Sequence, residues 1–204
     1  IIGTLVLVQL NFLIVLLSVF SIFLYAFIYT PLKQKSPIAV FLGAIPGALP
    51  PLIGYYAAFK SAGFGFEYTA VSEAAMIITP FVLFVIQFLW QFPHFWAIAW
   101  VADDDYKAAG IRLLPTTKKD SISAFMIYIS AVFMVPAGFI PIYFGFAGWI
   151  FTVVSVLLGL MFAWYGYRHY KEQTDASAKK VMYTSFLYLP VTQLVLLFNF
   201  IPFK

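Results

Sequence analysis

Long stretches without a charged residue constrain this chain more than any other feature. No Asp, Glu, Lys or Arg occurs in residues 1–32, 36–59, 74–102, 121–167 or 181–203. A membrane-spanning helix needs about 20 predominantly apolar residues, so every one of these stretches is long enough to cross a bilayer. A mean hydropathy of +0.95, with only 10% charged residues, excludes an ordinary soluble domain. We therefore predict an all-α, polytopic membrane helical bundle.

The breaks within the longest stretches place the individual helices. Residues 121–167 hold two helices, separated around Pro136 and Pro141. Asn11 divides the first stretch. The prediction is the end of one helix at residues 1–10 and six complete crossings, at about 12–30, 37–59, 76–101, 122–140, 147–167 and 182–201. Residues 1–204 then form a single transmembrane domain.

The start of the sequence and its lack of cysteine limit the interpretation further. The first residue is Ile within an apolar run, without the basic segment that begins a signal peptide. We expect a longer protein with further helices before Ile1. The absence of cysteine excludes disulfides, thiolate metal sites and cysteine nucleophiles within these residues.

Charge asymmetry between alternating loops predicts the orientation. All but two of the twelve Lys and Arg residues fall on one side. These are Lys33, Lys35, Lys107, Arg112, Lys118, Lys119, Arg168, Lys171, Lys179 and Lys180. Only Lys60 and Lys204 fall on the other side. The positive-inside rule makes the first side cytoplasmic and puts the C-terminus outside. The basic residues then need no nucleic-acid partner to explain them.

Three consecutive aspartates, Asp103, Asp104 and Asp105, follow the third crossing on the cytoplasmic side. Negative charge at a helix C-terminus is opposed by the helix macrodipole, and adjacent carboxylates repel one another. A divalent cation that holds an anionic cytoplasmic substrate would compensate. Alternatively, Asp103 caps a short second helix that begins at Asp104, where acidic residues are favourable. The residues alone leave both interpretations open.

Polar residues form a line on the third crossing. On a helical wheel with Gln87 as the origin, Gln91, His94 and Asp105 fall within an arc of about 60°. Polar groups within a membrane usually face the bundle interior or a wet cavity. His94 and Asp105 are about 16 Å apart along a helix, so one ion cannot bind both. We expect His94 to serve a deeper acceptor substrate. Pro93 is a possible kink that would rotate the two halves.

Structural roles compete with these functional ones. Gln87 and Gln91 also suit simple hydrogen bonds between helices, and His94 suits a hydrogen bond to a neighbouring helix. Lys33 and Lys35 fit snorkelling at a helix end as well as a phosphate contact. His169 is interpreted as a loop residue without a chemical role.

Two segments resemble a known family. The first segment contains Tyr29-Thr-Pro-Leu-Lys-Gln-Lys-Ser-Pro-Ile and Gly43-Ala-Ile-Pro-Gly-Ala-Leu-Pro-Pro-Leu-Ile-Gly54. The second contains Trp90-Gln-Phe-Pro-His-Phe-Trp and Asp104-Asp-Tyr-Lys-Ala-Ala-Gly-Ile-Arg-Leu-Leu-Pro115. Both resemble the protohaem IX farnesyltransferases (haem O synthases), which are UbiA-like intramembrane prenyltransferases. The two segments cover about half of the chain.

The resemblance implies a nine-helix prenyltransferase fold, of which this chain is the last two-thirds. It also implies an enzyme that transfers farnesyl from farnesyl diphosphate to a vinyl group of haem b, giving haem O. Farnesyl diphosphate would bind through Mg²⁺. The bacterial cytoplasmic (inner) membrane is the implied location, with the lipid bilayer as surroundings and haem A synthase or a terminal oxidase assembly as a possible partner.

Individual site residues follow from the same resemblance. Asp104 and Asp105 match the second acidic motif and would hold the metal and support catalysis, with Asp103 as an additional acid. A second group would bind diphosphate, and a third would line the acceptor cavity. The diphosphate group is Lys33, Lys35, Tyr29 and Tyr106, and the acceptor group is His94, Gln87 and Gln91, with His94 also a catalytic candidate.

The chain departs from the family pattern in two places. The first acidic motif, an Asn/Asp-rich loop between the second and third helices, is absent, so we expect this portion alone to be inactive. Val101 and Ala102 precede the acids where many relatives carry a basic residue. One diphosphate contact is therefore in question.

Two other functions compete with haem farnesylation. A related UbiA-like enzyme with a quinone-precursor or chlorophyllide acceptor would use the same architecture. A secondary transporter would use Gln87, His94 and Asp105 as an ion path. Transport is the weaker alternative because no inverted repeat is found in the sequence.

Overall fold

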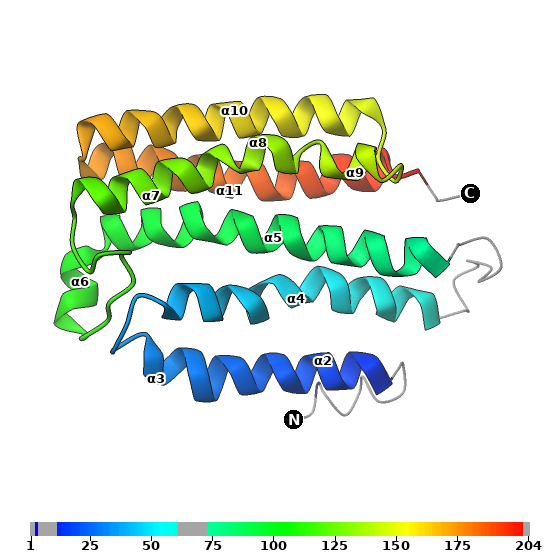
Figure 1. The fold of residues 1–204 in the computed structure, drawn as a ribbon, viewed down its shortest axis with the longest axis horizontal. Coiled ribbons are helices and arrows are strands. Elements are labelled where there is room, and N and C mark those ends of the chain that lie inside the picture. The colour runs from blue at the N-terminus through cyan, green and yellow to red at the C-terminus, as the bar shows by residue number, and fades with distance from the viewer. Residues whose placement is uncertain (1–2, 4–11, 61–72, 202–204) are drawn as a thin grey trace.

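The computed structural model describes residues 3, 12–60 and 73–201, and it is a bundle of antiparallel helices (Figure 1). The long helices are α2 (Phe12–Phe23), α4 (Ala39–Lys60), α5 (Glu73–Val101), α7 (Ser121–Val132), α10 (Trp149–Glu172) and α11 (Asp175–Phe198). The short ones are the π-helix η1 (Leu24–Tyr29) and α3 (Thr30–Leu32), α6 (Asp103–Ala108), α8 (Met134–Ala137) and α9 (Ile140–Tyr143). The all-α prediction is confirmed.

Six helical segments are long and apolar enough to cross a membrane, as the sequence predicts. They are Phe12–Leu32, Ala39–Ala57, Ile77–Val101, Ser121–Tyr143, Trp149–Glu172 and Asp175–Phe198. The last helix begins seven residues before the predicted start at 182, because Thr174 caps it and its first turns carry the charged residues. The predicted helix end at 1–10 and the break at Asn11 lie outside the described residues.

The first and fourth spans change helix type along their length. The first passes from α2 through η1 to α3, and the Thr30 hydroxyl donates to the Tyr25 carbonyl oxygen at 2.8 Å. Single π-helical turns are frequent at functional sites. The fourth breaks into α7, α8 and α9 around Pro136 and Pro141, where the sequence places the helix boundary.

Helices α2, α4 and α5 lie side by side, and α5 also packs against α7 and α11 (Figure 1). Helix α4 is unbroken although it contains Pro46, Pro50 and Pro51. Helix α10 approaches α8 closely at Gly159, where an added Cβ would lie 3.0 Å from the Met134 carbonyl oxygen. Lipid offers no hydrophobic drive for helix association, so such close packing and interhelical hydrogen bonds hold the bundle together.

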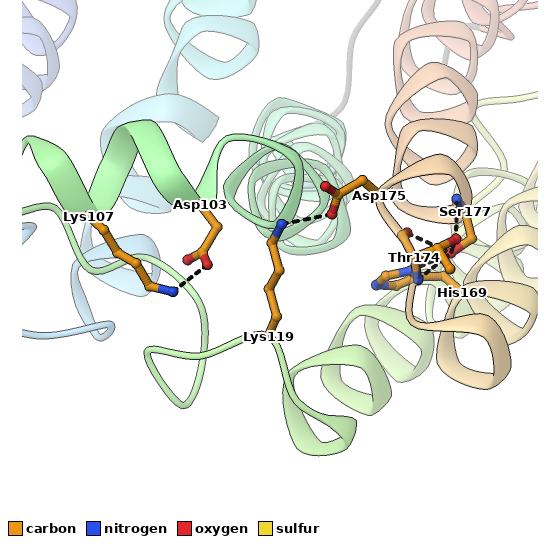
Figure 2. Close-up of polar contacts among 7 residues, drawn as sticks. All are labelled: Asp103, Lys107, Lys119, His169, Thr174, Asp175 and Ser177. Carbon is orange, nitrogen blue, oxygen red and sulfur yellow. Dashed lines mark hydrogen bonds and ion pairs between the residues drawn. The ribbon is translucent and has the colours of Figure 1, made fainter.

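His169 is not a loop residue, which corrects the sequence-based interpretation. It lies in the last turn of α10, fully buried, and its Nδ1 is 2.9 Å from the Ser177 hydroxyl on α11. Gln173 adopts a left-handed φ of 49° that ends α10, and Thr174 caps α11 through the Ser177 amide. His169 therefore joins the two helices, as Figure 2 shows.

The connections 33–38, 102–120 and 173–174 lie at one end of the bundle, and 144–148 lies at the other (Figure 1). We call the first end the basic end, because the loops and helix termini there carry the ten Lys and Arg residues predicted for one side of the membrane.

Candidate functional site

Two loops at the basic end are joined through their main chains. The Arg112 amide donates to the Lys33 carbonyl oxygen at 2.8 Å, so the segment after α6 lies beside the segment after α3. Leu113 and Leu114, which follow Arg112, are buried at 6% and 3% exposure. Their burial anchors the loop on the bundle. The hydrogen bond between Arg112 and Lys33 brings the predicted diphosphate-binding Lys33 close to the loop that follows the three aspartates.

A polar cavity of about 410 Å³ lies beside α6 at this junction. Asp103, Tyr106 and Lys107 line it from α6, and Arg112 and Thr117 line it from the loop. Lys107 donates to the Asp103 carboxylate at 2.6 Å, and Figure 2 shows this pair on α6. One acid and two bases give the lining a net positive charge, which suits an anionic ligand.

Two titratable side chains in the cavity have shifted pKa values. The hydrogen bond and charge of Asp103 raise the pKa of Lys107, so the amine remains protonated at neutral pH. Burial raises the pKa of Tyr106, so the phenol remains neutral and can donate a hydrogen bond.

The wall of this cavity contains two left-handed backbone conformations. Gly110 has a φ of 70° and Thr117 a φ of 65°. Glycine adopts such a φ without strain, whereas a β-branched threonine is an outlier there. The strain costs about 1–3 kcal/mol, and such outliers cluster at ligand-binding sites. The packing around the loop therefore holds Thr117 in a conformation that it would not adopt alone.

The three aspartates have separate environments. The short second helix of the structural alternative is present as α6, and its first turn holds all three acids, but its N-cap is Ala102 and not Asp103. Asp103 is buried and paired with Lys107, while Asp104 and Asp105 are exposed. Successive helix positions lie about 100° apart, which directs the three carboxylates differently. Among residues 12–60 and 73–201, no three acidic or histidine side chains converge on one point.

This donor set nevertheless fits Mg²⁺ held together with a substrate. Mg²⁺ commonly keeps several waters and uses one or two carboxylates plus substrate phosphate oxygens, rather than a complete protein cage. Asp104 and Asp105 present free carboxylates at the basic end. These two residues could contribute to such a site.

An apolar groove of about 390 Å³ runs between the first span, α4 and α5. Tyr25 and Tyr29 line it from η1, Gly43 and Gly47 from α4, and Gln91 from α5. Leu113 lines both this groove and the polar cavity, so it lies between the two spaces and they are neighbours. An apolar space beside a positively charged one is the arrangement that a molecule with a long apolar tail and an anionic head requires.

Two glycines of α4 leave room for the larger side chains that line the groove. An added Cβ at Gly43 would lie 2.5 Å from the Tyr29 ring, and one at Gly47 would lie 2.9 Å from the Gln91 Cδ. Lys33 lies over the Tyr29 ring, with its Nζ 5.7 Å from the centroid. Lys35, by contrast, is exposed, and none of the ion pairs within residues 12–60 and 73–201 involves it.

The polar residues predicted to form a line along α5 contact two different neighbouring helices. Gln91 is 2% exposed and donates to the Ala44 carbonyl oxygen on α4 at 3.0 Å. Gln87 instead accepts from Gln193 on α11 at 3.1 Å. The line does not continue to Asp105, because α5 ends at Val101 and α6 starts a new helix.

His94 also faces α11. Its Nδ1 is 2.7 Å from the Ser185 hydroxyl, and the Trp90 ring stacks on it at 4.2 Å between centroids. Trp90 itself donates to the Ser185 carbonyl oxygen at 2.9 Å. Gln87, Gln91 and His94 thus each make a hydrogen bond to a neighbouring helix, as their alternative structural roles predict. Of these three side chains, only Gln91 lines the groove.

Three residues that the structure brings into the site region have no predicted role in it. Arg112 and Thr117 line the polar cavity, and Ser185 bonds to His94. Arg112 was counted as an orientation determinant and lies in the family-like segment 90–115, where no binding role was given to it. Nothing in the local pattern marks Thr117 as left-handed, and Ser185 is one of many small polar residues in the last helix.

The fold and site define a multi-pass integral membrane protein with an apolar groove that opens beside a positively charged cavity. The chain belongs to the UbiA prenyltransferase family, whose model matches residues 1–189. The resemblance found in the sequence motifs is thereby confirmed.

Its relatives include proteins named protoheme IX farnesyltransferase. One from Cytophaga hutchinsonii is 45% identical over 180 residues, which is 88% of this chain and 58% of the relative. One from Christiangramia forsetii is 40% identical over 200 residues, or 96% and 62%. One from Solibacter usitatus is 38% identical over 176 residues, or 86% and 56%. The chain therefore spans about three fifths of the length of these relatives. No solved structure matches the chain significantly.

Proposed function

We propose that the protein containing this chain transfers a farnesyl group from farnesyl diphosphate to a vinyl group of haem b, giving haem O. The observation that carries the proposal is that Leu113 lines both the apolar groove and the polar cavity, so the two spaces are neighbours. A prenyl diphosphate has the matching shape, with an apolar tail and an anionic head. The names of the relatives favour protohaem as the acceptor.

In the proposed reaction, the C1–O bond of the donor breaks and diphosphate leaves. The terminal vinyl carbon forms a bond to C1, and water adds to the internal carbon with release of a proton. Bound Mg²⁺, held by Asp104 and Asp105, would neutralise charge on the diphosphate oxygens. The remaining positions around Mg²⁺ would be filled by waters and by diphosphate oxygens.

The chain's own side chains would orient and stabilise the leaving group. Lys33 and Lys35 place positive charge at the basic end, where negative charge builds on diphosphate as the C1–O bond breaks. Neutral Tyr106 and Tyr29 can donate hydrogen bonds to it. The apolar lining of the groove keeps water away from C1 until the vinyl group reacts.

His94 would act on the acceptor side of the reaction. It lies about 10 Å below the end of α5, at a rise of 1.5 Å per residue, and is separated from the acids in depth. The stacking of Trp90 and the bond to Ser185 fix the orientation of its ring. Its role in haem contact, with Gln87 and Gln91 nearby, rests on this depth and on the family resemblance.

The proposed location is the bacterial cytoplasmic membrane, with the basic end in the cytoplasm. The positive-inside rule supports this orientation. Diphosphate metabolites are available on that side. A haem A synthase or terminal oxidase assembly that accepts haem O would be a natural partner.

Haem O formation by membranes that contain the whole protein tests the proposal. We expect Asp105→Asn to abolish product without preventing membrane insertion. Asp175→Asn is the matched control, because Asp175 lies at the same end but pairs with Lys119 at 2.7 Å. Normal haem O formation by Asp105→Asn would contradict the metal assignment.

Two further measurements separate the acceptor from the donor. His94→Ala should impair haem use while leaving Mg²⁺-dependent diphosphate binding intact. Offering quinone precursors and chlorophyllide in place of haem tests the related prenyltransferase activities. Substrate flux without Mg²⁺ or diphosphate release would instead identify a transporter.

A further inference from the structure

The positive charge of the polar cavity comes mainly from Arg112, which lies in the family-like segment 90–115 but was given no binding role there. Asp103 and Lys107 form an ion pair across the cavity wall at 2.6 Å, so their charges offset one another. Arg112 lines the same cavity, and it makes no ion pair with any residue in 12–60 or 73–201. Its charge is therefore the excess charge of the cavity.

We propose that Arg112 is a phosphate-binding residue that holds the diphosphate head of the prenyl donor in this cavity. The proposal rests on the proposed function for the identity of the donor. A guanidinium group presents a planar fork of N–H donors that matches two phosphate oxygens at once. The neutral Tyr106 hydroxyl and Lys107 line the same space and can complete the anion's hydrogen bonds.

The main chain fixes where Arg112 can reach. Its amide bonds to the Lys33 carbonyl oxygen at 2.8 Å, and buried Leu113 follows it. Leu113 also lines the apolar groove, so Arg112 lies one residue from the point where a prenyl tail would meet its diphosphate. The Arg112 side chain is exposed, but its backbone is held in place on both sides.

Binding of inorganic diphosphate, measured by calorimetry on the whole purified protein with Mg²⁺, tests the proposal. Arg112→Gln should weaken binding about tenfold or more, because hydrogen bonds to charged groups contribute strongly. Arg112→Lys should recover part of the loss, since it restores the charge but not the fork. Both variants keep the amide at 112 and its bond to Lys33.

Arg168→Gln is the matched control, because Arg168 pairs with Glu172 on α10 and lines neither cavity. It should bind diphosphate like the parent protein. Unchanged binding in Arg112→Gln, or an equal loss in Arg168→Gln, would overturn the proposal.

A phospholipid headgroup carries the same chemistry, so a second measurement separates the two sources. The thermal stabilisation given by added phosphatidylglycerol is compared in the parent and in Arg112→Gln. Loss of that stabilisation with diphosphate binding intact would assign Arg112 to lipid and overturn the proposal. The diphosphate assay needs no haem, so a failure to form haem O would not affect its result.

Discussion

The main-chain amide of Arg112 and the carbonyl oxygen of Lys33 are hydrogen-bonded at 2.8 Å, although 79 positions separate them in sequence (112 against 33). This bond places the loop after α6 against the loop after α3. It brings a diphosphate-binding candidate of the first span beside the polar cavity under α6.

The bond predicts that cysteines at positions 33 and 112 can be cross-linked. Residues 1–204 contain no cysteine, so Lys33→Cys with Arg112→Cys introduces two defined thiols into this part of the protein, and any cysteine elsewhere is first replaced by serine. A short bifunctional thiol reagent should join them in intact membranes, detected by mass spectrometry of the linked peptides. Lys33→Cys with Arg168→Cys is the control, because α10 and α3 lie on opposite sides of the bundle (Figure 1). Equal cross-linking of both pairs would argue against the contact.

Gly110→Ala should destabilise the protein by about 1–2 kcal/mol, because alanine is strained at a φ of 70°. No atom lies within 4 Å of the added Cβ, so the effect is purely conformational. Gly54→Ala in α4 also meets open space but has an ordinary φ, and it should be neutral or stabilising. Thermal unfolding in detergent measures both. A similar loss from the two substitutions would refute the conformational explanation.

Gly47→Ala should destabilise the protein by about 1–3 kcal/mol, because the added Cβ displaces Gln91 from its bond to Ala44. The effect should shrink sharply when Gln91 is first replaced by Ala. A double-mutant cycle on thermal stability measures this coupling. Additive losses would mean that Gly47 is required for some other reason.

Ser185→Ala should cost about 0.6 kcal/mol, and up to 1.7, because it removes the hydroxyl that bonds to His94 between α5 and α11. Ser130→Ala is the matched control. Its hydroxyl bonds only to carbonyl oxygens of its own helix, at Met126 and Ile127, so its loss should be nearly neutral. Unfolding of the three proteins in detergent decides the matter, and a neutral Ser185→Ala would show that the contact contributes little.

The predicted orientation can be tested with the same cysteine-free background. Lys118 is exposed at the basic end, and Tyr143 is 84% exposed at the opposite end. A membrane-impermeant maleimide added to intact cells should label Tyr143→Cys but not Lys118→Cys. Inverted membrane vesicles should give the reverse pattern. Labelling of Lys118→Cys in intact cells would show that the basic end faces outward and would contradict the predicted orientation.

The sequence by itself determined the helices and much of their chemistry. Hydrophobic stretches of sufficient length have only one stable arrangement in lipid, because each backbone amide must be satisfied within its own helix. The six spans and the break near Pro136 could therefore be predicted, as could the candidate acids and Lys33. The family could also be predicted, from short motifs within these same segments.

Only the tertiary structure decided which residues meet. A helical wheel places Gln91 and His94 on one arc, but it cannot tell that α4 receives the first and α11 the second. His169 was placed in a loop because nothing local marks Ser177 as its partner. The bond between Arg112 and Lys33 depends on two loops that are distant in sequence. Local hydrophobicity fixes each helix, whereas the neighbours of a side chain depend on how all the helices pack together.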